Sequence, residues 1–457
     1  MKDKVSGTFS PILKVLALAG AGASISVAVG AQTLVSLYEK ARMQDSQFRA
    51  AQAALAAAQE KPRQARAVLL PTVNLTANQN QQNGQTAFDS APFIDRNVQS
   101  WGWTLQLTQP LLRLGNWIAR DQADAQVAAA QAQFAVAQNE LALRTVQAYF
   151  DVAVAMQSLV VAQAQLDAVN EQLAVAQRGF KVGSGTVTDV HEAQAKQALG
   201  TAQQVTAVND LAVKESELER IIGESLRVAP VRMGGLSAAG APRPLAEWLR
   251  LASTDNAMVQ AQQAALLEAQ HQVRKNTALH APTLDLTASQ AANYSSGTMV
   301  SPALVANRVQ SQQVGLQLTV PLYAGGGTQS LVREAVALEE KARQELAAAQ
   351  RNAASQVRQA YAGVVNGLAQ VEALQAAVQA SKNAVESNKI GYRIGTRISP
   401  DVLSAEQQLY QAERDLNKAQ FDAAMQQLKL LVAAGHLQEA DLQNLQNLIT
   451  PANVAQP

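Results

Sequence analysis

An internal repeat is the sequence feature that most restricts how this chain can fold. The phrase APTLDLTASQ at Ala281–Gln290 nearly repeats LPTVNLTANQ at Leu70–Gln79, and its proline follows the earlier one at an offset of 211 residues. The same offset separates two Leu-Gln-Leu-Thr phrases, and later landmarks share an offset of 212 residues. A tandem duplication of roughly 200 residues follows, so each structural unit should occur twice.

Each half contains two segments that alternate between apolar and polar residues. They are Thr72–Asn78 and Trp101–Thr108 in the first half, and Leu284–Ser289 and Val314–Val320 in the second. Alternation with a period of two is typical of strands with one apolar face. We expect four strands of about ten residues each, which is the length of tilted strands that cross a membrane.

A long helical pattern without proline follows each pair of strands. Within these two patterns apolar residues recur every seven positions, as at Leu166 and Leu173 in the first and Val364 and Val371 in the second. Such spacing predicts supercoiled helices. At about 1.5 Å per residue, each helix would extend roughly 100 Å. Aromatic residues make up only 4% of the chain, which favours long helices over a compact aromatic core.

The repeat divides the chain into five segments. They are a signal peptide at 1–31, repeat 1 at 32–222, a linker at 223–244, repeat 2 at 245–434 and a C-terminal tail at 435–457. In repeat 1 we expect a first helix, a β-hairpin at 71–110, a long helix at 116–180 and a return helix at 189–222. In repeat 2, after its own first helix, the hairpin should span 282–321, the long helix 328–393 and the return helix 401–434.

The first residues have the composition of a secretory signal peptide. Lysines precede an apolar run, and small residues precede Gln32, where cleavage is expected. The alternative is an N-terminal membrane anchor, but the run is shorter than the roughly 17–25 apolar residues that a spanning helix needs.

Four strands are too few to close a membrane barrel. An open sheet in lipid would leave the N–H and C=O groups of its edges without partners, so other copies of the chain must complete it. Two copies give an eight-stranded barrel, whose interior side chains fill, whereas three give twelve strands and room for water. We therefore expect a mainly α protein that forms a homotrimer, with a membrane β-barrel continued by an α-helical barrel.

Three aromatic residues near the expected strand ends fit interfacial positions in such a barrel. They are Trp101, Trp103 and Tyr294. Aromatics packed in a soluble sheet are the alternative.

Composition argues against several other functions. The formal net charge of +1 gives no reason to expect nucleic acid, and the absence of cysteine excludes disulfides and thiol catalysis. The four histidines show no metal-ligand spacing, and we find neither a phosphate-binding loop nor a Gly-x-Ser-x-Gly motif. We therefore expect no enzyme activity, no cofactor and no metal.

The heptads alone would also fit a periplasmic coiled-coil scaffold, but four alternating strands and an export signal favour a channel.

Three phrases, together with the duplicated strand phrase, carry a resemblance to a known family. QLTVPLYAGG at Gln317–Gly326, FKVGSGTVTDV at Phe180–Val190 and GYRIGTRISPDVL at Gly391–Leu403 resemble the TolC family of trimeric outer-membrane ducts, in order over essentially the whole mature chain. The resemblance implies a homotrimer in the outer membrane of a Gram-negative bacterium, in contact with its lipid. It also implies a helical tunnel in the periplasm. The partners would be a periplasmic adaptor, or membrane fusion protein, and an inner-membrane ABC, RND or MFS transporter. The cargo would be drugs or proteins of type I secretion.

The resemblance also implies a gate at the periplasmic end of the tunnel. By motif position, Tyr392 should bond Asp189, and Arg397 should bond Thr188 and Asp189. An arginine fork on a carboxylate is directional and stronger than a neutral hydrogen bond. Local sequence has another interpretation, since Asp189 and Glu192 also form a capping-box pattern at a helix start.

Further positions follow from the same resemblance. Asp401 would line the constriction, and Ser404 stands one turn later, where some family members carry a second acid. The glycine-rich turns would dock the adaptor through Gly183, Gly185 and Gly395. Ser399–Pro400 also reads as a helix start, so capping and gating are both open for Asp401.

Overall fold

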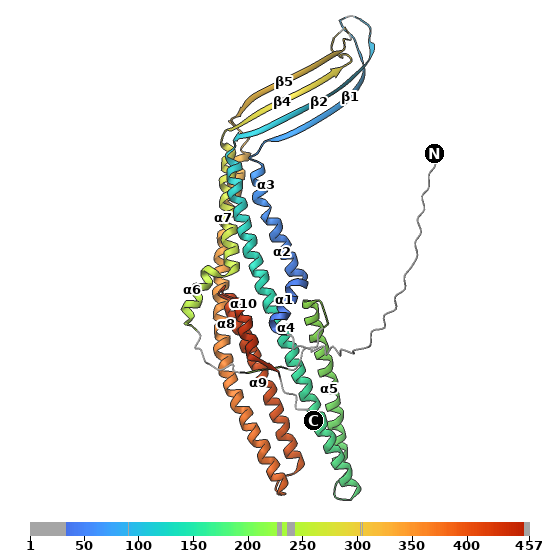
Figure 1. The fold of residues 1–457 in the computed structure, drawn as a ribbon, viewed down its shortest axis with the longest axis vertical. Helices are drawn as coiled ribbons and strands as arrows, with labels where there is room; N and C mark the ends of the chain where they lie inside the picture. Colours follow the sequence, from blue (N-terminus) through green and yellow to red (C-terminus); the bar gives the residue numbers. More distant parts are fainter. Residues whose placement is uncertain are drawn as a thin grey trace, which may run out of the picture.

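The computed structural model describes residues 33–89, 91–225, 231–234, 243–301, 303 and 305–451. The predicted signal peptide and its cleavage point therefore lie outside the described residues, as do most of the predicted linker and the last part of the tail. The described chain is mainly helical, with one four-stranded sheet at one end of a long helical body (Figure 1).

The sheet is built from both halves of the chain. Its strands are β1 (Thr72–Thr86), β2 (Ile94–Leu112), β4 (Thr283–Ser295) and β5 (Asn307–Thr319), in the order β1-β2-β4-β5. All three pairings are antiparallel. Each repeat thus supplies one hairpin, and the β2–β4 pairing joins the repeats. In the single chain β1 and β5 are edge strands, because each pairs with one neighbour only.

The strands are longer than the predicted ten residues. β1 has 15 residues and β2 has 19, while β4 and β5 have 13 each. The added part of β1 reads QNQQNGQT from Gln79 to Thr86 and is polar on both faces. It has no apolar–polar alternation, so the signal used for the prediction ends where the apolar face ends.

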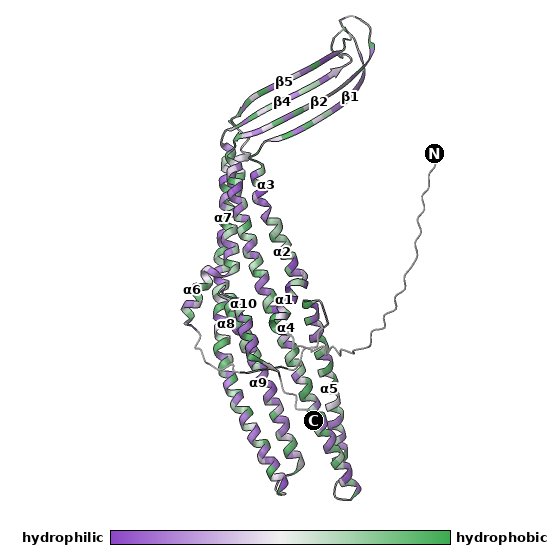
Figure 2. Ribbon diagram, in the orientation of Figure 1, coloured by the Kyte–Doolittle hydropathy of each residue, from purple (hydrophilic) through white to green (hydrophobic). Residues whose placement is uncertain are grey.

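The two faces of the sheet differ in polarity. One face carries Val73, Leu75, Trp101, Trp103, Leu105, Leu107, Leu284, Leu286, Leu316 and Leu318, joined across the strands by the register. The opposite face carries mostly Thr, Asn, Gln and Ser. Figure 2 shows this alternation along the strands. Leu75, Leu316 and Leu318 are 69%, 67% and 63% exposed. An apolar surface of this kind requires lipid or a protein partner.

Two helical hairpins form the opposite end of the molecule. The first consists of α4 (Leu114–Lys181, 68 residues) and α5 (Val187–Ile222), and the second of α8 (Gly327–Arg393, 67 residues) and α9 (Ser399–Ala433). The predicted heptads lie in their seams, since Leu166, Leu173, Val364 and Val371 are all buried. By length and composition α4 could also cross a membrane, but many of its apolar side chains, including that of Leu141, pack in the helical core.

Shorter helices pack against the long ones between their middle and the sheet (Figure 1). The predicted first helix of repeat 1 is three helices, α1 (Leu34–Gln44), α2 (Ser46–Gln59) and α3 (Lys61–Ala67). Asp45 breaks it, because its carboxylate accepts a hydrogen bond from Phe48 N at 2.7 Å and so caps a new helix. Repeat 2 begins with α6 (Leu245–Asp255) and α7 (Ala257–Thr277), followed by the short η1 (Ala278–His280).

The described part of the tail also forms secondary structure. It forms α10 (Glu439–Leu448), whose Leu442 and Leu445 are buried, and β6 (Ile449–Pro451), which pairs with β3 (Val231–Met233). The sequence prediction did not resolve these elements, because they are too short to show a clear period.

The buried core has two parts, of which the larger joins both repeats and the smaller lies within repeat 2. The larger cluster joins α1, α4, α5, α9 and α10 and includes Leu37, Tyr149 and Leu428. Burial raises the pKa of Tyr149 to about 12, because its ionised form would lose hydration. The second cluster joins α6, α7, α8 and α9 and includes Trp248 and Val357. Both clusters lie midway along the helices, so they fix the hairpins at one end and leave the tips to project.

Candidate functional site

The tips of the two helical hairpins share one backbone design. Gly183 and Gly395, at equivalent positions in the repeats, both have φ of 78°, a conformation that glycine adopts without strain. Ser184 N donates to Gly179 O at 2.9 Å, and Thr396 N donates to Gly391 O at 2.9 Å. The duplication therefore gives both tips the same tight turn, although their side chains differ.

The first tip carries Thr188 and Asp189, which are both exposed at the start of α5. The Asp189 carboxylate accepts hydrogen bonds from Thr186 N and Thr186 Oγ1, both at 2.8 Å. These two bonds, the backbone one first, lower the pKa of Asp189. The capping box therefore consists of Thr186 and Asp189. The predicted box of Asp189 and Glu192 is wrong by one turn, because Thr186 and not Asp189 is the N-cap.

The second tip carries the remaining predicted gate residues. Tyr392, near the end of α8, is 54% exposed. Arg397 Nη1 lies 3.8 Å from Asp401 Oδ2, and Asp401 also accepts a bond from Ile398 N at 3.4 Å. Ser404 is exposed one turn further along α9.

The two tips stand apart in the single chain, as Figure 1 shows at the foot of the molecule. No hydrogen bond or ion pair between described residues joins Thr188 or Asp189 to Tyr392 or Arg397. The Asp189 carboxylate instead takes part in the capping box of its own helix, α5, and Arg397 pairs with Asp401 on the same tip. The predicted gate links therefore stay predictions.

Comparison of equivalent positions reveals an asymmetry that the sequence analysis missed. Tyr392 replaces Phe180, and Arg397 replaces Gly185, whereas the acids Asp189 and Asp401 occupy the same place. Both tips therefore offer a carboxylate, but only the second adds a phenol and a guanidinium at these equivalent positions. Aligning the repeats residue by residue would have found this difference.

An ion pair marks the base of the sheet on its polar face. Arg113, directly before α4, donates from Nε to Asp285 Oδ1 at 2.8 Å and from Nη2 to Asp285 Oδ2 at 2.6 Å. Asp285 is only 8% exposed. The bidentate geometry is the strong form of this interaction, and it ties the end of β2 in repeat 1 to β4 in repeat 2.

Two of the three predicted aromatics lie further from the strand ends than expected. Trp101 and Trp103 are inside β2, because this strand begins at Ile94, whereas Tyr294 is the penultimate residue of β4. Trp101 faces Tyr294 across the strands, with ring centroids 5.9 Å apart. All three stand on the apolar face. Beyond the Trp101–Tyr294 pair both faces of β1 are polar, and β2 keeps only Val98 and Ile94 as apolar residues.

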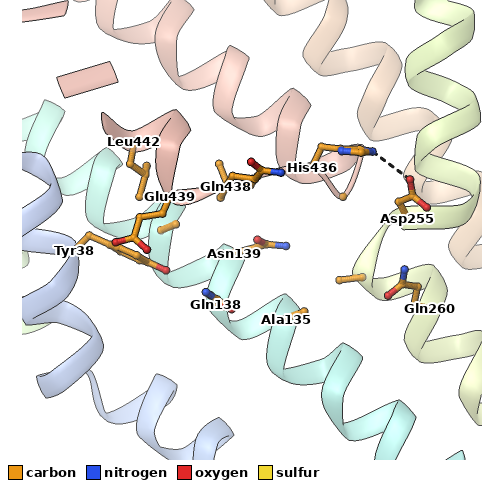
Figure 3. Close-up of a pocket in the computed structure, with 14 residues that line it drawn as sticks. Tyr38, Ala135, Gln138, Asn139, Asp255, Gln260, His436, Gln438, Glu439 and Leu442 are labelled. Atoms are coloured by element: carbon orange, nitrogen blue, oxygen red, sulfur yellow. Dashed lines mark hydrogen bonds and ion pairs between the residues drawn. The ribbon is translucent and has the colours of Figure 1, made fainter. Parts of the chain in front are cut away.

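A polar cavity of about 330 Å³ lies where α1, α4, α7 and α10 meet. Figure 3 shows Tyr38, Asn139 and Glu439 at its wall, with His436 Nε2 lying 3.1 Å from Asp255 Oδ2. Among the described residues no cluster of three His, Asp or Glu side chains could hold a metal ion. We find no arrangement here that suggests a reaction.

Comparison with known families gives a match in both repeats. The family model described as "Outer membrane efflux protein" matches residues 37–224 and again residues 248–436. The two matches coincide with the two halves of the internal repeat.

Curated relatives match over nearly the full length. The chain is 31% identical to the outer membrane protein TolC of Escherichia coli, over 97% of this chain and 91% of that protein. It is 31% identical to TolC of Vibrio cholerae, over 92% and 95%. It is 30% identical to the proteases secretion protein PrtF of Dickeya chrysanthemi, over 94% and 93%.

Solved structures share the fold at lower identity. The outer membrane protein VceC of Vibrio cholerae superposes with a TM-score of 0.70 at 20% identity, covering 88% of this chain and 96% of that one. The CmeC outer membrane channel of Campylobacter jejuni gives a TM-score of 0.71 at 17% identity, covering 91% and 89%.

Proposed function

This chain belongs to the outer membrane efflux protein family, and from that membership we propose that it is the exit duct of a tripartite export machine. Members of this family are outer-membrane channels, and the chain is one of them. In our proposal, an inner-membrane transporter and a periplasmic adaptor deliver cargo to the helical end, and the cargo leaves through the sheet end.

One observation carries the proposal: the sheet has an apolar face, a polar face and two edges that pair with no further strand in the described part of the chain. In lipid, unpaired edge groups cost several kcal/mol each, so the edges β1 and β5 must pair with other copies of the chain. Three copies, each with four strands, supply twelve strands and a water-filled interior. A coiled-coil scaffold explains neither this sheet nor the family membership.

Two cargo classes are open to such a duct. One relative is named for the secretion of proteases, whereas the matching family is named for efflux. Deleting the gene and measuring both drug susceptibility and the export of large secreted proteins separates the two. We expect at least one defect, restored by re-expression of the intact chain. A deletion strain with neither defect, although the protein normally resides in the outer membrane, would contradict the proposal.

We also propose that the hairpin tips close the periplasmic end. Supporting this, Tyr392 and Arg397 offer donors at the second tip, and Asp189 offers a charged acceptor at the first. Asp401 and Ser404 would line the opening, and the turns at Gly183, Gly185 and Gly395 would face the adaptor. Closure requires the two tips to approach, with Arg397 exchanging its partner Asp401 for Asp189 and Thr188.

The gate is tested by the double variant Tyr392→Phe/Arg397→Ser in planar bilayers. Loss of these donors should raise single-channel conductance, because the tips then have no link that holds them together. The matched control is Phe180→Tyr, which adds a phenol at the equivalent position of the first tip and should leave conductance unchanged. Equal conductance of the double variant and the parent would remove the gate assignment without affecting the duct.

A further inference from the structure

The polar face of the sheet carries almost no charge. Its residues, read from the strand register, are mostly Thr, Asn, Gln and Ser, and its charged positions within the described strands are Arg96 and Asp285. Two other charged strand residues, Asp95 and Arg308, stand on the opposite face, where Asp95 accepts a bond from Gln85 Nε2 at 2.7 Å. The inner wall of the proposed barrel is therefore close to neutral.

The first of these two charges is withdrawn from the surface. Arg96 is only 5% exposed, and its Nη1 donates to Thr298 O at 2.8 Å and to Ser301 O at 2.6 Å. Its guanidinium also stacks on Phe88, 5.0 Å from the ring centroid. The turn after β4 covers this cation, so the cation is shielded from anything that passes along the face.

The second charge, that of Asp285, is neutralised by an ion pair. Both carboxylate oxygens of Asp285 are bonded by the Arg113 guanidinium, which reaches onto the face from the residue before α4. Directly across the strands from Asp285 stand Gln317 of β5 and Pro110 of β2, which carry no charge. Without Arg113, the carboxylate of each chain would stand unpaired where the barrel meets the helical tunnel.

We propose that Arg113 sets the charge of the channel wall. By neutralising Asp285, it lets the exit section of the duct pass cargo of either charge. The inference rests on the proposed function, since it takes the polar face as the channel wall. It predicts that cationic and anionic molecules, and polypeptides of either net charge, pass the barrel equally well. Selection among cargoes then occurs before the barrel, at the transporter or the tips.

The chain lacks cysteine, so a single engineered thiol can report the local potential. Gln317→Cys is the reporter, because Gln317 is exposed and faces Asp285 in the register. Intact cells expressing it are treated from outside with a cationic and with an anionic methanethiosulfonate reagent. The rate of modification by the cationic reagent, divided by the rate for the anionic reagent, measures the charge near the wall. The measurement does not depend on whether the periplasmic end is open.

In the reporter alone, this ratio should equal that of a small free thiol. Arg113→Gln should raise it about tenfold, because a unit charge within several ångströms attracts the cation and repels the anion. Asp285→Asn should lower it by a similar factor, and the double variant Arg113→Gln/Asp285→Asn should restore the parent value. A second reporter, Gln313→Cys, lies four residues along the same face and should respond weakly, because salt screens charges beyond about 8 Å.

The possible outcomes test two claims separately, namely that Arg113 sets the charge of the wall and that the polar face is the channel wall. If Gln317→Cys reacts but both single variants leave the ratio unchanged, Arg113 does not set the charge of the wall. A different result, in which Gln317→Cys is inert and Leu316→Cys on the apolar face reacts, would show that the wall has been assigned to the wrong face. That result would contradict the proposed barrel itself. If Arg113→Gln fails to assemble, Asp285→Asn tests the same claim with the opposite sign.

Discussion

At the scale of single residues, glycines with the same backbone conformation lie in different surroundings. Gly435 and Gly183 each follow a long helical segment and have φ of 76° and 78°. A Cβ on Gly435 would lie 2.0 Å from the carbonyl oxygen of Asp255, whereas one on Gly183 would meet nothing within 4 Å. The first glycine is needed for close packing as well as for its conformation, and the second only for its conformation.

Gly435→Ala should therefore destabilise the protein by about 2–4 kcal/mol, because it combines backbone strain with a clash against the main chain of another helix. The matched variant Gly183→Ala should cost about 1 kcal/mol, from strain alone. Thermal unfolding of the purified proteins, followed by circular dichroism, checks the difference. Equal unfolding temperatures for the two variants would contradict this prediction. They would show that the backbone at the α6–α7 junction shifts to accommodate the added methyl group without loss of stability.

At the scale of elements, the two helical hairpins differ in what holds them together. Lys389 Nζ lies 2.8 Å from Glu406 Oε1, and Lys382 Nζ lies 3.4 Å from Glu413 Oε1, so ion pairs cross between α8 and α9. The hydrogen bond to Glu406 raises the pKa of Lys389. Near its tip the α4–α5 hairpin uses neutral amides instead, such as Gln197 Nε2 donating to Asn170 Oδ1 at 2.8 Å. Its ion pair, with Lys214 Nζ 3.8 Å from Asp151 Oδ2, lies far from that tip.

The second hairpin should thus be the salt-sensitive one. Lys389→Ala should loosen the tip of α8–α9 by at most about 1 kcal/mol, since both partners are partly exposed. Hydrogen exchange of peptides covering this tip should rise at low salt and match the parent at high salt, where screening already weakens the pair. Gln177→Ala, the equivalent change in α4, is the control and should show no salt dependence. A loss that is the same at all salt concentrations would mean that packing, not charge, holds the tip.

Elements with a strong period could be predicted from the sequence, and those without one could not. The buried heptads at Leu166 and Val371 were visible because packing repeats every seven residues. The outer part of β1 was invisible because Asn and Gln occupy both of its faces. At the tips, the sequence identified Asp189 as important but could not decide its partner. The choice between Thr186 and Arg397 depends on distances across space, and for Arg397 on the assembled state.

At the scale of the whole molecule, one chain is an incomplete structure. Among the described residues, the sheet has free edges at β1 and β5, and no other element covers its apolar face. The helical core fixes only the middle of the long helices. Assembly should therefore stabilise both ends, and the protein should be stable only as a ring of copies in lipid or detergent.

Cysteine pairs on the two edge strands test the ring. Thr76→Cys on β1 should be combined in turn with Gln313→Cys, Gly315→Cys and Gln317→Cys on β5, which lie on the same face. At the matching register, oxidation should link neighbouring chains and give dimers and trimers on denaturing gels. Thr76→Cys with Thr287→Cys on β4 is the control and should give no ladder, because β4 is an inner strand. A largest species other than the trimer would contradict three-fold assembly.

The polar extension of the strands determines where exported molecules emerge. Beyond Gln79, which pairs with Trp101, β1 continues for seven residues, or about 23 Å of strand. If the aromatic pair sits at the headgroup level, the rim of the mouth stands above the bilayer surface. A hydrophobic solute released there enters bulk water first. It must then diffuse back along the polar extension of the strands before it can re-enter the membrane.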